Sequence, residues 1–268
     1  MEILSIILIA CLCIGALWVG SHTWRMGRRV LYIVLVASVA FISFYIICQL
    51  FPWVSLTFFP WTNYAYFEQV WLFPMAILVL ACAVGRLDNV RETRAVKILI
   101  AFLCFGTCMM QASPLINRIR MGEFLEDFDD PGLVYQSSNW SCAPASIASL
   151  LRMKGIHAAE QEMAVLSLTK PLIGTTPRGA CLGLERKAGK LGWHARIVKR
   201  DYDELMELEP PFLTSYMLGG RIAHMVVATG VYEDYFHMFN PLGGHEMQKR
   251  DEFESNHLGY AILFEKTE

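Results

Sequence analysis

Four apolar stretches near the start of the chain restrict its fold more than any other feature. They lie at residues 3–20, 30–51, 67–84 and 98–116. Each is close to the roughly 20 residues that an α-helix needs to cross the hydrocarbon core of a bilayer. The first stretch lacks the basic start and small-residue cleavage site of a secretory signal peptide, so we expect it to be retained. We therefore predict an all-α transmembrane region of four helices at residues 1–116.

The composition changes at the end of this region. Hydrophobic residues make up 54% of the chain and the mean hydropathy is +0.37, which is too high for an ordinary soluble protein. Residues 1–112 hold seven Lys/Arg and four Asp/Glu, whereas residues 113–268 hold 16 basic and 21 acidic residues. The second part therefore has the composition of a mildly acidic globular domain. Its charge shows no basic cluster of the kind that binds nucleic acid, so no nucleic-acid partner is expected.

Basic residues also predict an orientation in the membrane. They fall between the first and second stretches and between the third and fourth, at Arg25, Arg28, Arg29, Arg86, Arg91, Arg94 and Lys97. The positive-inside rule places these loops in the cytoplasm and both termini outside, although Arg118 and Arg120 argue for the reverse. We expect a multi-pass protein of the bacterial inner (plasma) membrane with an extracytoplasmic C-terminal domain. A cytoplasmic domain is the alternative.

The stretch at residues 135–152 carries the best candidate for a reactive group. Pro144 suits the first turn of a helix, and the periodic apolar residues after it predict a helix that begins at Pro144 and stops near Gly155. Cys142 then lies at a helix N-terminus, where the helix dipole favours the thiolate. Gln136 carries an amide that can donate to an oxyanion. This pattern predicts the nucleophile of a cysteine hydrolase.

A cysteine nucleophile needs an imidazole base and a third group that orients the imidazole. His224 opens the strand-like run Ala-His-Met-Val-Val-Ala-Thr-Gly, and Asn240 closes the next strand-like run before Pro241. Antiparallel pairing would bring the end of one strand beside the start of the other, so His224 and Asn240 are the candidate base and orienter. Two simpler roles remain open, a hydrogen-bonded histidine at a sheet edge and a turn at Asn-Pro-Leu-Gly-Gly.

The pattern after residue 133 predicts helices first and an antiparallel sheet later, the order of an α+β domain. Helices are expected at residues 144–154, 157–168, 177–191 and 202–206, and strands at 193–198, 212–216, 222–231, 235–240 and 260–264. An acidic linker at 117–132 separates this domain, residues 133–268, from the apolar region. Cys181 falls inside a predicted helix and is expected to pack there. The glycine pairs at 219–220 and 243–244 are expected to form turns.

Several motifs occur together in a fixed order. Gln136 lies six residues before Cys142, which begins Cys-Ala-Pro-Ala-Ser. Next come Gly-Thr-Thr-Pro-Arg-Gly, a helix that ends Lys-Leu-Gly-Trp-His-Ala-Arg, the His-Met-Val-Val strand and Asn-Pro. In this order the second half of the chain resembles the bacteriocin-processing, double-glycine leader peptidase family of papain-like cysteine peptidases. The chain departs from that family at Ala143, where glycine is usual, and at Asn240, where aspartate is usual.

The resemblance implies a papain-like fold and a role for each candidate residue. Cys142 would be the nucleophile, His224 the general base, Asn240 the orienter and Gln136 the oxyanion donor, with no metal or cofactor. The implied function is a membrane-anchored cysteine peptidase that acts on an exported or leader peptide, after small residues such as Gly-Gly. Its expected partners are this substrate, the lipid bilayer and an exporter or other membrane protein. The alternatives are a non-catalytic peptide-binding module of a secretion system and a cysteine amidase or acyltransferase.

Overall fold

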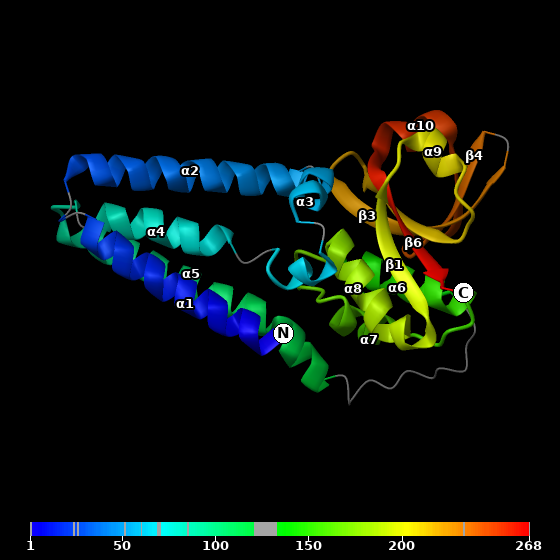
Figure 1. The fold of residues 1–268 in the computed structure, drawn as a ribbon, viewed down its shortest axis with the longest axis horizontal. Helices are drawn as coiled ribbons and strands as arrows, with labels where there is room; N and C mark the ends of the chain where they lie inside the picture. Colours follow the sequence, from blue (N-terminus) through cyan, green and yellow to red (C-terminus); the bar gives the residue numbers. More distant parts are fainter. Residues whose placement is uncertain are drawn as a thin grey trace. The chain divides into compact units, whose positions relative to one another are not determined.

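The computed structural model describes residues 2–23, 25, 27–50, 52–59, 61–68, 71–84, 86–120, 133–232 and 234–267. The chain divides into two compact units, Met1–Ser113 and Pro114–Glu268 (Figure 1). Most of the predicted acidic linker, at residues 121–132, lies outside the described residues.

The first unit is helical. Its elements are α1 (Glu2–Thr23), α2 (Arg28–Leu50), α3 (Pro52–Phe58), the 3-10 helix η1 (Thr62–Tyr66), α4 (Leu72–Val84) and α5, which spans Val90–Arg120 and so extends past the unit. In the part of the chain that the structure describes, three helices have the length and composition to cross a membrane. Their apolar segments are Ile3–Thr23, Arg28–Cys48 and Val90–Pro114.

The prediction of four membrane-spanning helices is therefore wrong. Helix α4 has 13 residues and rises about 20 Å, short of the roughly 30 Å of a hydrocarbon core. The predicted third span at 67–84 failed because Phe67 and Glu68 form a turn after η1. Helix α4 nevertheless packs along α1, where a Cβ on Gly20 would clash with Ala81. Small residues allow such close helix contacts in membranes.

Polar contacts fix the direction of these helices. At one end of the unit, Thr23 Oγ1 lies 3.1 Å from Cys82 Sγ, which joins the C-terminal ends of α1 and α4. At the other end, Gln111 of α5 donates to Ser5 Oγ at 2.9 Å and to the Tyr66 carbonyl at 3.0 Å. Helices α1 and α4 therefore run in one direction and α5 runs in the other.

The second unit consists of helices around a single sheet. Its helices are α6 (Cys142–Met153), α7 (Glu160–Leu166), α8 (Pro177–Ala188), the 3-10 helix η3 (Gly189–Leu191), α9 (Tyr202–Met206) and α10 (Arg250–Asn256). Its strands are β1 (Trp193–Lys199), β2 (Phe212–Leu218), β3 (Ile222–Tyr232), β4 (Tyr235–Asn240), β5 (Gly244–Lys249) and β6 (His257–Lys266). All pairings are antiparallel, in the order β1-β6-β2-β3-β4-β5. The predicted α+β order is confirmed.

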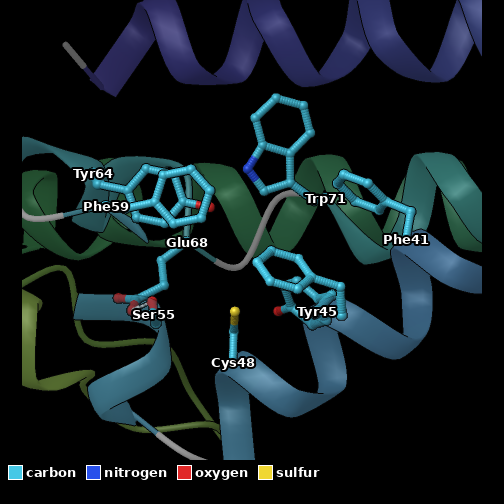
Figure 2. Close-up of a pocket in the computed structure, with 9 residues that line it drawn as sticks. Phe41, Tyr45, Cys48, Ser55, Phe59, Tyr64, Glu68 and Trp71 are labelled. Carbon is cyan, nitrogen blue, oxygen red and sulfur yellow. Dashed lines mark hydrogen bonds between the residues drawn. The ribbon is translucent and has the colours of Figure 1, made fainter. Parts of the chain in front are cut away.

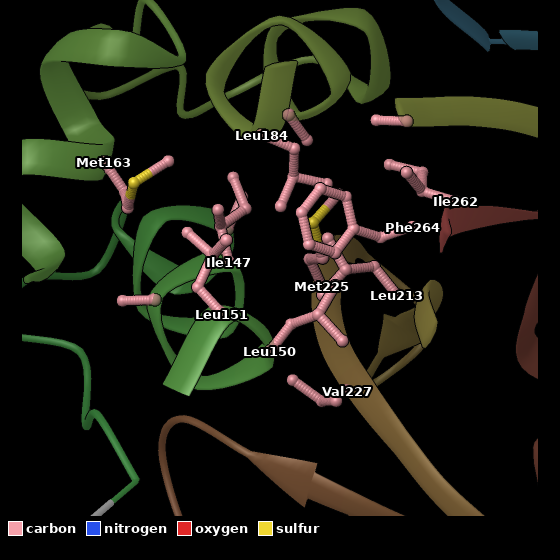
Figure 3. Packing of buried hydrophobic residues seen from close by; sticks show 14 of the residues in the cluster. Ile147, Leu150, Leu151, Met163, Leu184, Leu213, Met225, Val227, Ile262 and Phe264 are labelled. Carbon is pink, nitrogen blue, oxygen red and sulfur yellow. The ribbon is translucent and has the colours of Figure 1, made fainter. Parts of the chain in front are cut away.

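Both faces of the sheet are covered because its strands alternate two sets of apolar residues. Leu213 and Ile262 point to the face that carries Ile147 of α6 and Leu184 of α8 (Figure 3). Their neighbours along the strands, which include Phe212, pack on the opposite face with residues of α9 and α10. Figure 1 shows α6, α7 and α8 on one side of the sheet and α9 and α10 on the other.

Two details differ from the sequence prediction. Helix α6 begins at Cys142 itself and contains Pro144 in its first turn. Proline costs no hydrogen bond there, because the first four N–H groups of a helix have no intrahelical acceptor. The first hydrogen bond of α6 runs from Ala145 N to Ser141 O at 3.1 Å. Strand β5 and helix α10 were not predicted. Strand β5 was missed because it is an edge strand with mostly polar residues. The stop near Gly155 is confirmed, since the helix ends at Met153 and Gly155 has a φ of +74°.

Candidate active site

The loop before α6 is fixed by hydrogen bonds of its own side chains. Ser141 Oγ accepts from the Ser138 N–H at 3.0 Å and from the Ser138 hydroxyl at 2.8 Å. The Ser137 N–H donates at 2.8 Å to the buried carboxylate of Glu160 on α7. These hydrogen bonds therefore fix the position of Gln136 relative to Cys142.

Cys142 is the first residue of α6 and its thiol is partly buried. Burial raises the pKa of the Cys142 thiol, and the backbone N–H groups of Met225, Ala143 and Cys142 oppose that rise to a smaller extent. The N–H groups of Ala143 and Cys142 belong to the first turn of α6, where the sequence predicted an effect of the helix dipole, but desolvation has the larger influence on this pKa.

Helix α6 lies against β3 next to His224. Ser146 of α6 donates to the Met225 carbonyl at 2.9 Å, and the Met225 N–H is one of the groups that stabilise the Cys142 thiolate. The ring of Tyr216 on β2 packs edge-on against the ring of His224, with centroids 5.8 Å apart. Cys142 also acts electrostatically on Tyr216. Residues of β2, β3 and the start of α6 thus surround both the Cys142 thiol and the His224 imidazole.

His224 and Asn240 are in direct contact, as strand pairing predicted. His224 Nε2 lies 2.8 Å from Asn240 Oδ1, and both residues are almost fully buried. Burial lowers the pKa of His224, while the hydrogen bond to Asn240 and the charge of Glu246 raise it by lesser amounts. The Asn240 carbonyl oxygen can only accept, so the Nε2 atom carries the proton and Nδ1 keeps a lone pair.

A carboxylate that the sequence did not reveal stands behind Asn240. The Asn240 amide Nδ2 donates to Glu246 Oε2 at 3.0 Å and lies 3.5 Å from the Tyr216 hydroxyl. Asn240 Oδ1 also accepts from the Leu242 N–H at 2.9 Å. Because donors and acceptors surround both ends of the amide, its orientation toward His224 is determined. Residues 224, 240 and 246 thus form one hydrogen-bonded chain.

The turn between β4 and β5 makes room for this carboxylate. A Cβ on Gly243 would collide with Glu246 Oε1, so the glycine leaves the space that the carboxylate occupies. Gly244 has a φ of +92°, which favours glycine, and a Cβ there would meet the Tyr135 hydroxyl at 3.1 Å. The glycine pair therefore has a second effect besides turning the chain, since it admits Glu246 to the site.

Gln136 is joined to the same turn through its backbone. Its N–H donates to the Pro241 carbonyl at 3.0 Å, which places the loop before Cys142 beside the residue that follows Asn240. Its side-chain Nε2 donates to the Ser138 carbonyl at 2.7 Å. One of the two amide N–H groups is thereby used to position the side chain.

The remaining candidates from the sequence have structural roles. Cys181 is buried in the core on α8, as predicted, and burial raises the pKa of its thiol. Gly219 and Gly220 have φ values of +57° and +68° and form the predicted turn between β2 and β3. Glu160, Tyr216 and Glu246 were missed by sequence reasoning. Nothing in the sequence pointed to Glu246, because it lies on a polar edge strand that has no apolar period to reveal it.

Two relatives come from one genus. An uncharacterized protein of Methanothermobacter marburgensis is 32% identical over 139 residues, which is 52% of this chain and 92% of the relative. Another uncharacterized protein, from Methanothermobacter thermautotrophicus, is 29% identical over 137 residues, or 51% of this chain and 90% of the relative.

Two solved structures are also similar. The peptidase domain of Streptococcus ComA, a bi-functional ABC transporter of a quorum sensing pathway, is 25% identical with a TM-score of 0.45, covering 52% of this chain and all of that domain. A double glycine motif protease from an AMS/PCAT transporter, in complex with its leader peptide, is 20% identical with a TM-score of 0.43 and covers 51% and 91%.

The match to a known family covers the whole of the α+β domain. The family described as the Peptidase C39 family matches residues 131–268, which is more than half of the chain and includes every residue of the candidate site. The fold expected from the resemblance, with helices before an antiparallel sheet, is the fold observed. The chain therefore belongs to the Peptidase C39 family.

Proposed function

We propose that this protein is a membrane-anchored cysteine peptidase in which Cys142, His224 and Asn240 carry the reaction. The observation that carries the proposal is the 2.8 Å contact between His224 Nε2 and Asn240 Oδ1, beside a cysteine at the start of a helix. Family membership supports peptide-bond hydrolysis as the reaction class.

The geometry supports a specific course for this reaction. With its proton on Nε2, His224 offers the Nδ1 lone pair to the Cys142 thiol. The thiol proton passes to Nδ1 as sulfur attacks the peptide carbonyl, and the imidazolium then protonates the leaving amine. The second N–H of the Gln136 amide and the Cys142 backbone N–H hold the oxyanion. Water attacks the acyl-enzyme and regenerates the thiol.

The resting site is neutral in this proposal. Burial raises the pKa of the Cys142 thiol and lowers the pKa of His224, so the thiol and neutral imidazole are both favoured over an ion pair near pH 7. The imidazolium forms during attack, and it needs stabilisation at that moment. Glu246 supplies a negative charge to it through the Asn240 amide.

Glu246 compensates for the neutral orienter of this chain. Where the double-glycine peptidases usually have aspartate, this chain has Asn240, which carries no charge. Glu246 is one hydrogen bond further from His224 and its charge raises the pKa of that residue. We assign Glu246 as a positioning residue that fixes the Asn240 amide and restores the missing charge.

The membrane unit supports an extracytoplasmic peptidase. The contact between Thr23 and Cys82 brings together the helix ends that precede residues 25–29 and 86–97, where the basic side chains lie. Helix α5 begins at this basic end and leads away from it to the peptidase unit. The positive-inside rule then favours an outside peptidase domain, and an exported peptide as its substrate. Cleavage after small residues such as Gly-Gly follows from the resemblance.

Labelling with a thiol-directed activity probe tests the nucleophile. We expect the full-length protein to be labelled, Cys142→Ala to lose the label, and Cys181→Ala to keep it, because Cys181 is the other cysteine of the peptidase unit and lies in its core. Equal labelling of wild type and Cys142→Ala would refute the peptidase assignment. Product analysis with a Gly-Gly peptide separates hydrolysis from acyl transfer.

A further inference from the structure

Two cavities of the helical unit differ in the charge of their linings. One, of about 220 Å³, is lined by six aromatic residues with Glu68, and none of its nine lining residues is basic (Figure 2). The other, of about 570 Å³, lies where α1, α4 and α5 meet, and its lining includes Lys97. We call the second cavity the basic-end groove. Its apolar wall consists of Ile14, Leu17, Trp18, Ala81, Val84 and Ile100.

The lining of the basic-end groove changes from apolar to polar along the helices. Its polar residues are Ser21 on α1 and Lys97 on α5. Helix α1 runs toward the basic end of the unit and α5 starts there, so Ser21 lies about 10 Å beyond Ile14, and Lys97 lies about one turn before Ile100. The groove therefore has a polar mouth at the basic end and an apolar interior. A phospholipid has the same division between head group and acyl chain.

Lys97 is an ionisable residue within an apolar membrane segment. It belongs to the candidate span Val90–Pro114, and the next charged residue of α5 is Arg118. Charged residues inside such segments are rare, and they mark sites for ligands or for pairing with other charges. Among the described residues, no carboxylate forms an ion pair with Lys97. Its ammonium group can therefore bind an anion from outside the chain.

The charge around the mouth of the groove is also positive. The segments 25–29 and 86–97 hold seven Lys/Arg and two acids, Asp88 and Glu92, a net charge of +5. The contact between Thr23 and Cys82 brings the ends of α1 and α4 together beside these segments. Basic residues at a membrane surface attract anionic lipids, and basic pockets between membrane helices bind their head groups. The charge thus favours an anionic lipid over a zwitterionic one.

Trp18 indicates the depth of the groove in a bilayer. Its side chain is 63% exposed, and its ring lies beside that of His22 with centroids 4.8 Å apart. Tryptophan is enriched at the level of the lipid head groups. Because Trp18 lies between Ile14 and Ser21 in the groove wall, the mouth of the groove lies at the level of the lipid phosphates.

We propose that the basic-end groove binds an anionic phospholipid, with an acyl chain along its apolar wall and the head-group phosphate at Lys97. The volume is within the roughly 300–1,000 Å³ of small-molecule sites, so it accommodates part of one acyl chain. Such a lipid would join α5 to α1 and α4. The proposal requires the helical unit to lie in a membrane, and it is independent of the peptidase reaction.

Native mass spectrometry of the full-length protein, released from nanodiscs with equal amounts of phosphatidylglycerol and phosphatidylethanolamine, tests this proposal. We expect wild type to retain phosphatidylglycerol about 5-fold over phosphatidylethanolamine, and Lys97→Gln to lose this preference. Lys97→Arg, which keeps the charge, should retain it. Arg94→Gln is the matched control, because Arg94 is an exposed cation one turn earlier on α5 and does not line the groove.

Two results with these variants would overturn the proposal. One is the absence of any preference in wild type. The other is an equal loss of preference in Lys97→Gln and Arg94→Gln, since diffuse attraction between the basic segments and anionic lipid would have that effect.

A second pair of variants tests the apolar wall. Ile14→Trp places a larger side chain in the groove, so we expect it to reduce the retention of phosphatidylglycerol several-fold. Ile7→Trp should bind like wild type, because Ile7 is also exposed on α1 and lies two turns away from the groove. Unchanged retention in Ile14→Trp would contradict the proposal, since it would leave a phosphate site without an acyl chain. Should Lys97→Gln fail to fold, the comparison of Ile14→Trp with Ile7→Trp decides.

Discussion

At the scale of single residues, the site depends on where one negative charge is placed. Asn240 contacts His224 but is neutral, and Glu246 holds the charge one hydrogen bond away. In the proposed mechanism, the imidazolium that forms during attack is therefore stabilised over a longer path than a direct aspartate would give. Substitutions can move the carboxylate from position 246 to position 240 and so test the effect of its placement.

Exchanging that charge should change the pH profile of the peptidase. We expect Glu246→Gln to lower kcat/KM about 10-fold and to shift its acidic limb to lower pH, because loss of a negative charge disfavours protonated His224. Asn240→Asp alone places two carboxylates together, while Asn240→Asp with Glu246→Gln restores a single charge and should recover most of the activity. An unchanged acidic limb in Glu246→Gln would remove Glu246 from the mechanism while leaving Cys142 in it.

The same buried histidine should make stability depend on pH. Burial lowers the pKa of His224 below its unfolded value of about 6.5, so the unfolded state binds more protons in the interval between the two values. The contribution of His224 to the free energy of unfolding is therefore fully present above about pH 6.5, and it is lost as the pH falls through the pKa of the folded state. We expect the thermal midpoint to fall between pH 7.5 and 5.5, less steeply in His224→Gln. The exposed His194→Gln should retain the wild-type slope.

At the scale of elements, glycine decides how closely α8 approaches the end of α7. A Cβ on Gly179 would lie 2.5 Å from the Ser167 carbonyl oxygen, and one on Gly183 would lie 2.9 Å from the Ser167 side chain. These two glycines are one helical turn apart, so they form a smooth stripe. This contact sets α8, and with it Cys181 and Leu184, against the core around α6.

A pair of glycine substitutions tests this contact. Gly179→Ala should destabilise the peptidase unit by about 1–3 kcal/mol, because backbone must move to admit the methyl group. Gly189→Ala has open space around its Cβ and a helical φ of −57°, so it should be neutral or stabilising by about 0.4–1 kcal/mol. Thermal unfolding monitored by circular dichroism measures both. Equal midpoints for the two variants would show that the contact is not needed.

At the scale of the whole molecule, the side of the membrane decides which peptides reach Cys142. The two basic segments lie at one end of the membrane unit, and α5 leads from that end to the peptidase. In this arrangement α2 leads away from the basic end, and η1 with the 13-residue α4 leads back to it. The proposed orientation therefore requires the segment of η1 and α4 to return the chain across the membrane, in addition to the three long helices.

Reporter fusions test that orientation directly. A periplasmic-type alkaline phosphatase fused after residue 268 should be active, and the same reporter fused after residue 97 should be inactive, because the positive-inside rule places the basic segments in the cytoplasm. An inactive fusion after residue 268, with an active cytoplasmic reporter at the same site, would move the peptidase inside. A leader peptide would then be its expected substrate.

The sequence by itself determined the parts that depend on local patterns. The apolar stretches, the helix that carries Cys142, the turn glycines and most strands follow from periodicity and from proline and glycine. The pairing of His224 with Asn240 was also predictable, because adjacent antiparallel strands bring an end beside a start. The order of motifs around these residues is enough to indicate the double-glycine leader peptidases, and the Peptidase C39 match agrees with it.

Only the tertiary structure decided the features that depend on contacts between distant residues. Glu246 lies on a polar edge strand without an apolar period, and its role appears only when the Gly243 turn folds it onto Asn240. Burial raises the pKa of the Cys142 thiol, which opposes the effect of the helix N-terminus that the sequence had emphasised. Burial and approach are properties of the packed chain, and they have no signal in local sequence.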